Sequence, residues 1–495
     1  MNDLTPRRVR TDNDKSFDDF HFYRPPAGTC LDLKRLTPEG VPGESPLNSP
    51  ILASPGQGRV RSRNEKHPMK TTPPFDLVLG LDRSDRKADL HLIDRGSGAE
   101  HRLTLPTSPE ALQAWAQAFR AAHPHSRVAI CFEQPANNLI AFLARYPWIT
   151  LYPINPISLQ KFRETFVVSR AKDDGKDAEY LAHLLAAHWE RFQPWQPDTQ
   201  PTRLLERLVV DRRSVVDHRT ALTNRLQAIL KDYFPQALEL AGDELWRPLA
   251  TAFLQRWPTL QALQKAKPDT IRKFYYAQGS RSQTLIQDRL DAIAHAVPLT
   301  DDPALLESYT LRVRLTVQEL ELVTQTIKLY DQKIATVFAD HPDHQIFRNL
   351  PGAGPVFGPR LLASLGTRRE DYPKAANLQR ASGIAPVTKQ SGHTKHVHRR
   401  YRCSVFFKQS IHEWAGESRF HSAWAGAFYE MKRAAGMKHH AAVRALAYKW
   451  LRVLWRCWQD RVVYVEEQYL AALKKHHSPI IECLSKTPLP ISPAQ

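Results

Sequence analysis

Four acidic side chains have the types and spacing that suit divalent metal ions. Asp82 follows the apolar run LVLGL and Glu133 follows VAICF, so each carboxylate is expected at the end of a buried strand. Asp174 and Asp177 stand three residues apart, which places both on one face of a helix. Phosphodiester cleavage with two metal ions needs several carboxylates that converge on one point. We therefore predict a catalytic Mg²⁺ or Mn²⁺ site formed by these four residues.

Neighbouring acids leave part of this assignment open. Asp173 lies four residues before Asp177 and could replace Asp174 as a ligand, whereas Asp85 lies just beyond the strand and belongs more naturally to a turn. An aspartate after a strand is an ordinary turn former, and Asp174 could simply cap its helix. The order of a strand Asp, a strand Glu and a helical Asp-x-x-Asp favours the joint metal site.

A serine in a basic segment is the second candidate for chemistry. Ser391 lies in TKQSGHTKHVHRRYR and is followed by Lys395, Arg399 and Arg400. Cations around a hydroxyl would bind a phosphate and stabilise the charge that develops when the hydroxyl attacks it. We predict a catalytic Ser391 in a loop; the alternative is a nucleic-acid-binding loop in which the serine is only structural.

Two other segments suit contact with a phosphate backbone. LPGAGPVFGPRLLASLG resembles a helix-hairpin-helix motif, in which Gly352 and Gly354 would let backbone N–H groups approach a phosphate. In HHAAVRALAYKWLRVLWRCW, Arg444, Arg452 and Arg456 recur on one face of a predicted helix. The alternatives are a plain turn before a helix and a solvated helix face.

The elements around the first two acids predict an α/β fold. Short apolar runs from Phe75 onward indicate three neighbouring strands, and the order βββαβαβα then continues through a buried strand and helices. This is the order of the RNase H-like (RuvC-like) fold. We assign it residues 74–198.

The rest of the chain is predicted to be mainly helical. Two long charged helices near 203–232 and 303–338 have heptad-like apolar positions, Leu311, Leu315 and Leu322 among them, which predicts a helical hairpin or coiled coil. We expect a disordered basic tail over 1–73 and a coiled-coil middle over 199–345, with an insertion at 236–300. An α-helical serine-bearing domain is expected over 346–470, and a loose C-terminal tail over 471–495.

Composition points to a polyanionic partner. The 495 residues carry a formal net charge of +18, and each phosphate that a cation neutralises releases counterions and adds affinity. No stretch has the roughly 18 uninterrupted apolar residues of a spanning helix, and the N-terminus lacks the apolar run of a secretory signal. We expect nucleic acid as the partner, no membrane association and a cytoplasmic location.

Together these motifs resemble a known family. KDDGKDAEYLA, followed by LPGAGP and GIAPVTKQSG, is similar to the DEDD transposases of insertion sequences, which are bridge-RNA-guided recombinases, and the resemblance extends over about 75–465. It implies that Asp82, Glu133, Asp174 and Asp177 bind metal and that Ser391 is catalytic. It also implies a structured noncoding guide RNA, donor and target DNA, and a homo-oligomer, a dimer or tetramer, with a composite active site. The tail before 74 and the insertion at 236–300 depart from shorter members.

The sequence therefore predicts a recombinase that cleaves and exchanges DNA strands through a divalent metal and a covalent phosphoserine intermediate. One alternative is a RuvC-like nuclease or junction resolvase that activates water. The other is a nucleic-acid-binding scaffold without catalysis, which the intact set of four acids disfavours.

Overall fold

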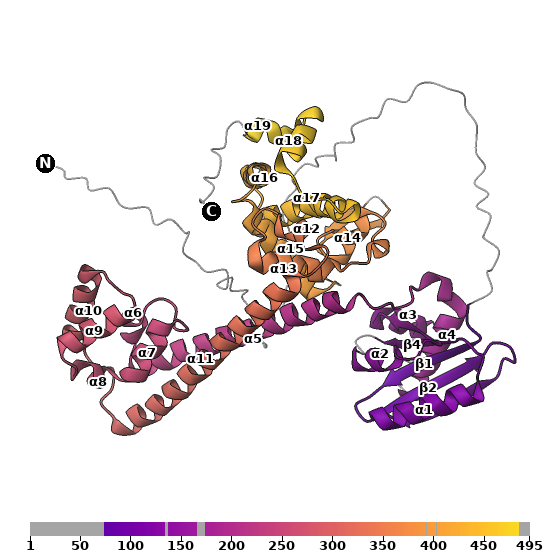
Figure 1. Cartoon of the computed structure of the whole chain (residues 1–495), viewed down its shortest axis with the longest axis horizontal. Coiled ribbons are helices and arrows are strands. Elements are labelled where there is room, and N and C mark those ends of the chain that lie inside the picture. Colours follow the sequence, from indigo (N-terminus) through magenta and orange to yellow (C-terminus); the bar gives the residue numbers. More distant parts are fainter. Residues whose placement is uncertain (1–73, 134–136, 166–173, 393, 402, 485–495) are drawn as a thin grey trace. The chain divides into compact units, whose positions relative to one another are not determined.

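Two compact units divide the chain between Pro197 and Asp198. The computed structural model describes residues 74–133, 137–165, 174–392, 394–401 and 403–484 (Figure 1). The predicted tail 1–73 lies outside these described residues.

The N-terminal unit is built on a mixed sheet with the strand order β3-β2-β1-β4-β5. β1 pairs antiparallel with β2, which pairs antiparallel with β3, whereas β1, β4 and β5 run parallel. The mixed sheet agrees with the predicted RNase H-like fold. The strands are β1 (Leu77–Arg83), β2 (Lys87–Asp94), β3 (Glu100–Pro106), β4 (Val128–Glu133) and β5 (Ile149–Ile154).

Helices cover both faces of this sheet because its central strands are apolar on both sides. The odd-numbered residues of β1, such as Leu79, pack with α1 (Pro109–Ala122) and α2 (Asn137–Leu143). On the other face, Val78 packs with α3 (Pro156–Glu164) and α4 (Asp174–His188). The short turn η2 (Trp189–Arg191) follows α4.

Two long helices, α5 (Gln200–Tyr233) and α11 (Pro303–Ala339), lie side by side in the second unit (Figure 1). Both helices lie where the sequence predicts them. The prediction of which leucines form the contact between the two helices is wrong, however. Leu311, Leu315 and Leu322 are exposed, and α11 instead buries another stripe, which includes Val313 and Leu320.

The insertion forms a helical region with its own core, packed on the ends of α5 and α11 nearest to it in sequence. Its helices are α6 (Ala237–Leu240), α7 (Pro248–Arg256), α8 (Leu260–Gln264), α9 (Pro268–Ala277) and α10 (Gln283–His295).

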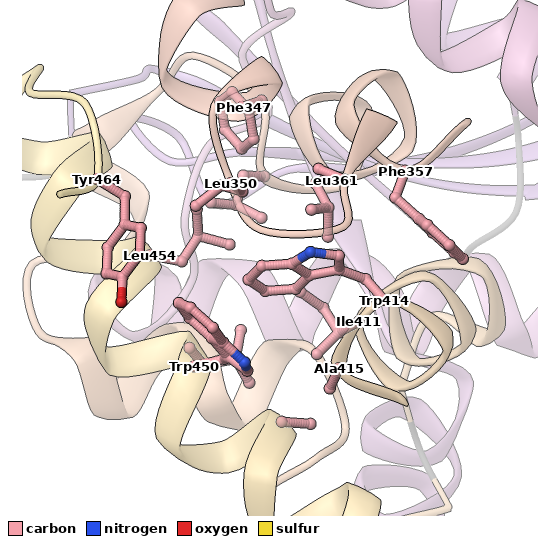
Figure 2. Packing of buried hydrophobic residues seen from close by; sticks show 14 of the residues in the cluster. Phe347, Leu350, Phe357, Leu361, Ile411, Trp414, Ala415, Trp450, Leu454 and Tyr464 are labelled. Atoms are coloured by element: carbon pink, nitrogen blue, oxygen red, sulfur yellow. The ribbon is translucent and has the colours of Figure 1, made fainter. Parts of the chain in front are cut away.

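The C-terminal region packs around buried tryptophans. Trp414 lies among Leu350, Leu361 and Trp450 in Figure 2, and its indole N–H donates to the Pro351 carbonyl at 2.9 Å. The elements are α12 (His344–Arg348), α13 (Gly354–Leu365), η3 (Arg369–Asp371), α14 (Ala375–Ala381), β6 (Val387–Ser391), β7 (Thr394–His398), α15 (Val405–Ser418), α16 (Ala423–Ala434), α17 (His439–Asp460), α18 (Glu466–Lys475) and α19 (Pro479–Leu484).

The prediction of a loose tail from residue 471 is wrong as far as 484. α18 continues to Lys475 and α19 follows it, because Leu473 and Ile480 are buried in the C-terminal core. Residues 485–495 lie outside the described part of the chain. Across the described residues, every helix is too short or too polar to cross a bilayer.

Candidate functional site

Asp82 and Glu133 lie at the carboxyl ends of two adjacent parallel strands, as the sequence predicts. Leu81 of β1 is in register with Phe132 of β4, so the two acids follow a matched pair. Side chains alternate between the faces of a strand. Since Leu81 and Phe132 face α1 and α2, both acids are on the face that packs against α4. Both acids are partly exposed.

Asp177 is held against this face by a very close approach of α4 to β1. A Cβ added to Gly80 would lie 1.8 Å from the carbonyl oxygen of Ala178, so only glycine fits there. Asp177 itself is only 7% exposed and accepts a hydrogen bond of 3.1 Å from Arg163 Nη1 of α3. Gly80 thus brings the strand that bears Asp82 to the helix that bears Asp177.

Of the remaining predicted acids, only Asp85 has a side chain within the described part of the structure. Asp174 is the first residue of α4, as the Asp-x-x-Asp spacing predicts, but the placement of its side chain lies outside the described part of the chain, as does the whole of the alternative Asp173. Asp85 is exposed in the turn after β1, which agrees with a turn role.

Sequence reasoning missed another acid on the same face. Asp89 of β2 is the register partner of Asp82, and directly paired residues of antiparallel strands share a face. The Thr104 hydroxyl donates to it at 2.6 Å and Lys87 Nζ lies 3.0 Å away. The Thr104 hydrogen bond, followed by Lys87, lowers the pKa of Asp89. Its alternation with apolar residues in KADLHLID is the signal that could have revealed it.

This set of donors fits hard divalent cations. Carboxylate oxygens are the ligands that Mg²⁺ prefers, and an ion with a few protein carboxylates keeps water or substrate oxygens in its remaining positions. Asp82 and Glu133 come from rigid neighbouring strands, which holds them in place for such an ion.

Ser391 lies at the tip of a hairpin, so its assignment to a loop is wrong. β6 and β7 pair antiparallel, with Ser391 opposite Thr394, and Gly392 in the turn has φ +55°. A left-handed turn residue favours glycine, and β-branched residues on both strands favour pairing. Ser391 is exposed. The Ser391 hydroxyl is therefore open to solvent at the tip of the hairpin.

The two glycines of the predicted hairpin motif serve different purposes. Both have positive φ, +68° at Gly352 and +49° at Gly354. A Cβ at Gly352 would lie 2.8 Å from the His421 ring and 3.0 Å from Glu417, so this glycine permits packing against the end of α15. Nothing lies within 4 Å of a Cβ built at Gly354. Of the two positions, Gly354 is the open one.

Two arginines, Arg399 after β7 and Arg444 of α17, lie near His412 of α15. Burial, followed by the nearby Arg399 guanidinium, lowers the pKa of Arg444. Burial lowers the pKa of His412 to about 4, and His440, Arg444, His439 and Arg399 add to the effect. Arg399 and Arg444 carry like charges that repel each other, so a bound anion would stabilise them. This arrangement suits a phosphate.

The other predicted basic residues differ from one another in their contacts and in their exposure to solvent. Arg400 Nε donates to the Ala385 carbonyl at 3.3 Å, which anchors the segment after β7. Arg456 forms an ion pair with Asp460, so its charge is neutralised, whereas Arg452 is exposed. Lys395 lies in β7, and its side chain is outside the described part of the structure.

Two lysines that the sequence reasoning missed extend this basic surface. Burial, followed by Arg452 and Lys432, lowers the pKa of Lys449. Lys432 and Lys449 each place the ammonium 5.5 Å from the centre of the Phe428 ring. The lysines come from α16 and α17, and their separation in sequence hides the cluster.

Comparison with known families agrees with this geometry. Residues 79–235 match a family described as "Transposase", the DEDD transposases of IS110 type, and residues 344–430 match "Transposase IS116/IS110/IS902 family". The first match contains all four predicted acids, and the second contains Ser391. The chain is a DNA transposase whose two matched regions are similar to the IS110 family. A DEDD domain of this kind implies an RNase H-like fold and a divalent metal.

Individual relatives extend the similarity over most of the chain. The mini-circle putative transposase for IS117 from Streptomyces coelicolor is 27% identical over 405 residues, 80% of this chain and 97% of that protein. An uncharacterized 43.6 kDa protein of the insertion element IS110, from the same organism, is 24% identical over 406 residues with the same coverage. An uncharacterized 42 kDa protein of IS900 from Mycobacterium paratuberculosis is 27% identical over 59% of this chain and 73% of its own length.

Proposed function

We propose that this transposase exchanges DNA strands through a reaction in which Ser391 is the nucleophile and Asp82, Glu133, Asp174 and Asp177 bind two Mg²⁺ or Mn²⁺ ions. The proposed metal site is supported by the position of Asp82 and Glu133 at the ends of adjacent parallel strands, on the face of the sheet that α4 covers. When bound, such ions neutralise the scissile phosphate and the oxygen atoms that attack and leave it.

The serine supports rejoining as well as cleavage. The Ser391 oxygen forms a bond to phosphorus while the bond from phosphorus to one deoxyribose oxygen breaks; the serine proton passes to water, and the released oxygen takes up a proton. Attack by the hydroxyl of another strand then reverses these changes and frees the serine. One phosphate ester bond replaces another at each step, so rejoining needs no external energy source.

Substitution of the acids tests the metal part of the proposal. Asp82→Asn and Glu133→Gln remove a charge and keep the side-chain volume, so the sheet should fold while DNA cleavage is lost. Asp85→Asn, in the exposed turn after the same strand, is the matched control and should cleave normally. Cleavage of the element's own ends in Mg²⁺ is the readout. Wild-type rates for Asp82→Asn or Glu133→Gln would refute the assignment.

We further propose that the basic surface around Arg399 and Arg444 binds DNA and a structured noncoding guide RNA. Its support is the proximity of the Arg399 guanidinium, which follows β7, to Arg444 of α17. Sequencing the RNA that copurifies with the transposase, with Arg399→Gln/Arg444→Gln beside the wild type, tests this. A single RNA enriched with the wild type and lost with the variant is expected; equal, heterogeneous RNA in both would contradict it.

Self-association into a dimer or tetramer is supported by an exposed stripe on α11. Leu315, Leu322 and Leu329 are spaced by seven residues, and all are more than half exposed. A heptad spacing matches the seam that a second copy of the same helix would bury. Leu322→Gln/Leu329→Gln should dissociate the oligomer in light scattering, whereas Leu285→Gln on α10 should not. An unchanged mass for the double variant would exclude this interface.

A further inference from the structure

A cluster of two histidines and a glutamate lies between the β2–β3 hairpin and α4, apart from the four acids. His91 Nε2 lies 2.9 Å from Glu100 Oε2, and His183 Nε2 lies 3.6 Å from the same oxygen. One ligand atom from each of the three residues lies within 4.8 Å of those from the other two. The cluster joins three elements: β2, β3 and α4.

The three side chains converge because of their positions in the fold. His91 is the register partner of Gly80, and Glu100 is the partner of Ile93, so both residues face α4. His183 lies on α4 one residue after Ala182, whose backbone nitrogen would lie 2.5 Å from a Cβ at Gly80. The same close helix approach that positions Asp177 therefore also brings His183 to the hairpin.

His91 is a buried side chain that turns one ring nitrogen toward the partly exposed carboxylate of Glu100. The side chain is 3% exposed, and its Nδ1 makes no hydrogen bond among the described residues. A buried polar ring is costly unless it is satisfied. Glu100 and His183 are each roughly two-fifths exposed, so the cluster opens to solvent on one side. A cation can enter there and draw the three groups together.

We propose that His91, Glu100 and His183 bind one Zn²⁺ ion. Two imidazole nitrogens and one carboxylate oxygen form a donor set typical of zinc, and three protein ligands leave one tetrahedral position for water. Nitrogen donors select this site against Mg²⁺, which prefers oxygen. The four acids and the histidine cluster thus bind different classes of metal.

The expected role of this ion is to fasten α4 to the sheet. His91 lies two residues from Asp89, about 7 Å along the strand, and Asp89 is the register partner of Asp82. The ion would therefore hold the helix that carries Asp174 and Asp177 without itself joining the catalytic acids. This inference does not depend on the proposed role of Ser391.

Zinc binding to the full-length transposase tests the proposal. Protein stripped with a chelator is titrated with ZnCl₂ in excess Mg²⁺, and bound zinc is counted by elemental analysis after desalting. The wild type should retain one more zinc per chain than His183→Ala, whose affinity at this site should fall by ~100-fold or more, since even residues that only orient ligands contribute ~10–100-fold. Zinc should also raise the melting temperature of the wild type more than that of the variant.

Two further variants make the result decisive. His101→Ala is the matched control, because His101 follows Glu100 in β3 and faces the opposite side of the strand, so it should bind zinc as the wild type does. Glu100→Gln, at an exposed ligand, should behave as His183→Ala does and guards against misfolding of a single variant. If both ligand variants retain as much zinc as His101→Ala, the cluster is only a hydrogen-bonded triad and the proposal fails.

Discussion

Gly80 is the position at which a single methyl group should separate α4, the helix that carries Asp174 and Asp177, from the sheet. In Gly80→Ala, the new Cβ would lie 1.8 Å from the Ala178 oxygen and 2.5 Å from the Ala182 nitrogen, both backbone atoms that no rotamer change can move. Ordinary contact begins near 3.4 Å, so α4 must withdraw from β1 by about 1.5 Å. The withdrawal increases the distance between Asp82 on the strand and Asp177 on the helix.

The magnitude of the effect follows from that displacement. A shift of about 1 Å in a catalytic group can cost ~10²-fold in rate, whereas overpacking of a core typically costs about 1–3 kcal/mol of stability. We therefore expect a folded Gly80→Ala protein with a lower melting temperature and DNA cleavage reduced at least ~100-fold. Single-turnover cleavage, measured well below the melting temperature of the variant, separates the two effects.

The control for Gly80 is Gly96→Ala in the turn between β2 and β3. There the nearest atom to an added Cβ is the Asp94 Oδ1 at 3.3 Å, the end of a side chain that can move. Gly96→Ala should cleave DNA at the wild-type rate. If Gly80→Ala also cleaves at the wild-type rate with an unchanged melting temperature, then α4 does not contribute to the site in the way described.

Three other predictions concern charge. Binding of nucleic acid should weaken steeply with salt because of the net charge of +18, and a flat plot of log K against log salt would contradict it. Arg369→Ala should lower the free energy of unfolding by about 3–5 kcal/mol in urea titrations. The reason is that the Asp343 side chain, which is only 4% exposed, would lose the ion pair that it forms with Arg369 at 2.8 Å. The control Arg368→Ala should lower it far less, because the partner of Arg368, Asp371, is exposed. The pKa of His412 is lowered to about 4, chiefly by burial, so the unfolded state binds more protons below pH ~6.5 and stability falls as the pH drops from ~6.5 toward 4. His412→Gln should remove about 2 kcal/mol of the loss between pH 7 and pH 5 in thermal melts, and an identical pH profile for this variant would refute the assignment.

The acids on strands were predictable because short apolar runs that end in a carboxylate combine secondary structure with chemistry. LVLGLD and VAICFE place Asp82 and Glu133 at strand ends without knowledge of the fold, and the βββαβα order makes the two strands neighbours. The importance of Gly80 was not predictable, since a glycine within a strand gives no indication of which backbone approaches it. Arg163 was missed for a similar reason, because its contact with Asp177 depends on how α3 packs against α4.

Periodicity alone misassigned the face of α11 that packs on α5. The helix carries two apolar stripes, and the one with regular leucines, at Leu315 and Leu322, is the exposed one. Burial in a helical pair depends on what the neighbouring helix presents, and a sequence pattern cannot show that. The hairpin at Ser391 was missed because its strands are polar and lack the alternation that marks a half-buried strand.

Ser391 is proposed to become covalently joined to DNA, and detection of that linkage tests the proposal most directly. Labelled DNA incubated with the transposase and its copurified RNA should give a slow, protease-sensitive band on a denaturing gel, with the phosphate mapped to Ser391. Thr394→Ala, which removes the hydroxyl opposite Ser391 in the hairpin, should still give the band, and Ser391→Ala should give none. Undiminished strand exchange by Ser391→Ala would contradict the account and favour a nuclease that activates water.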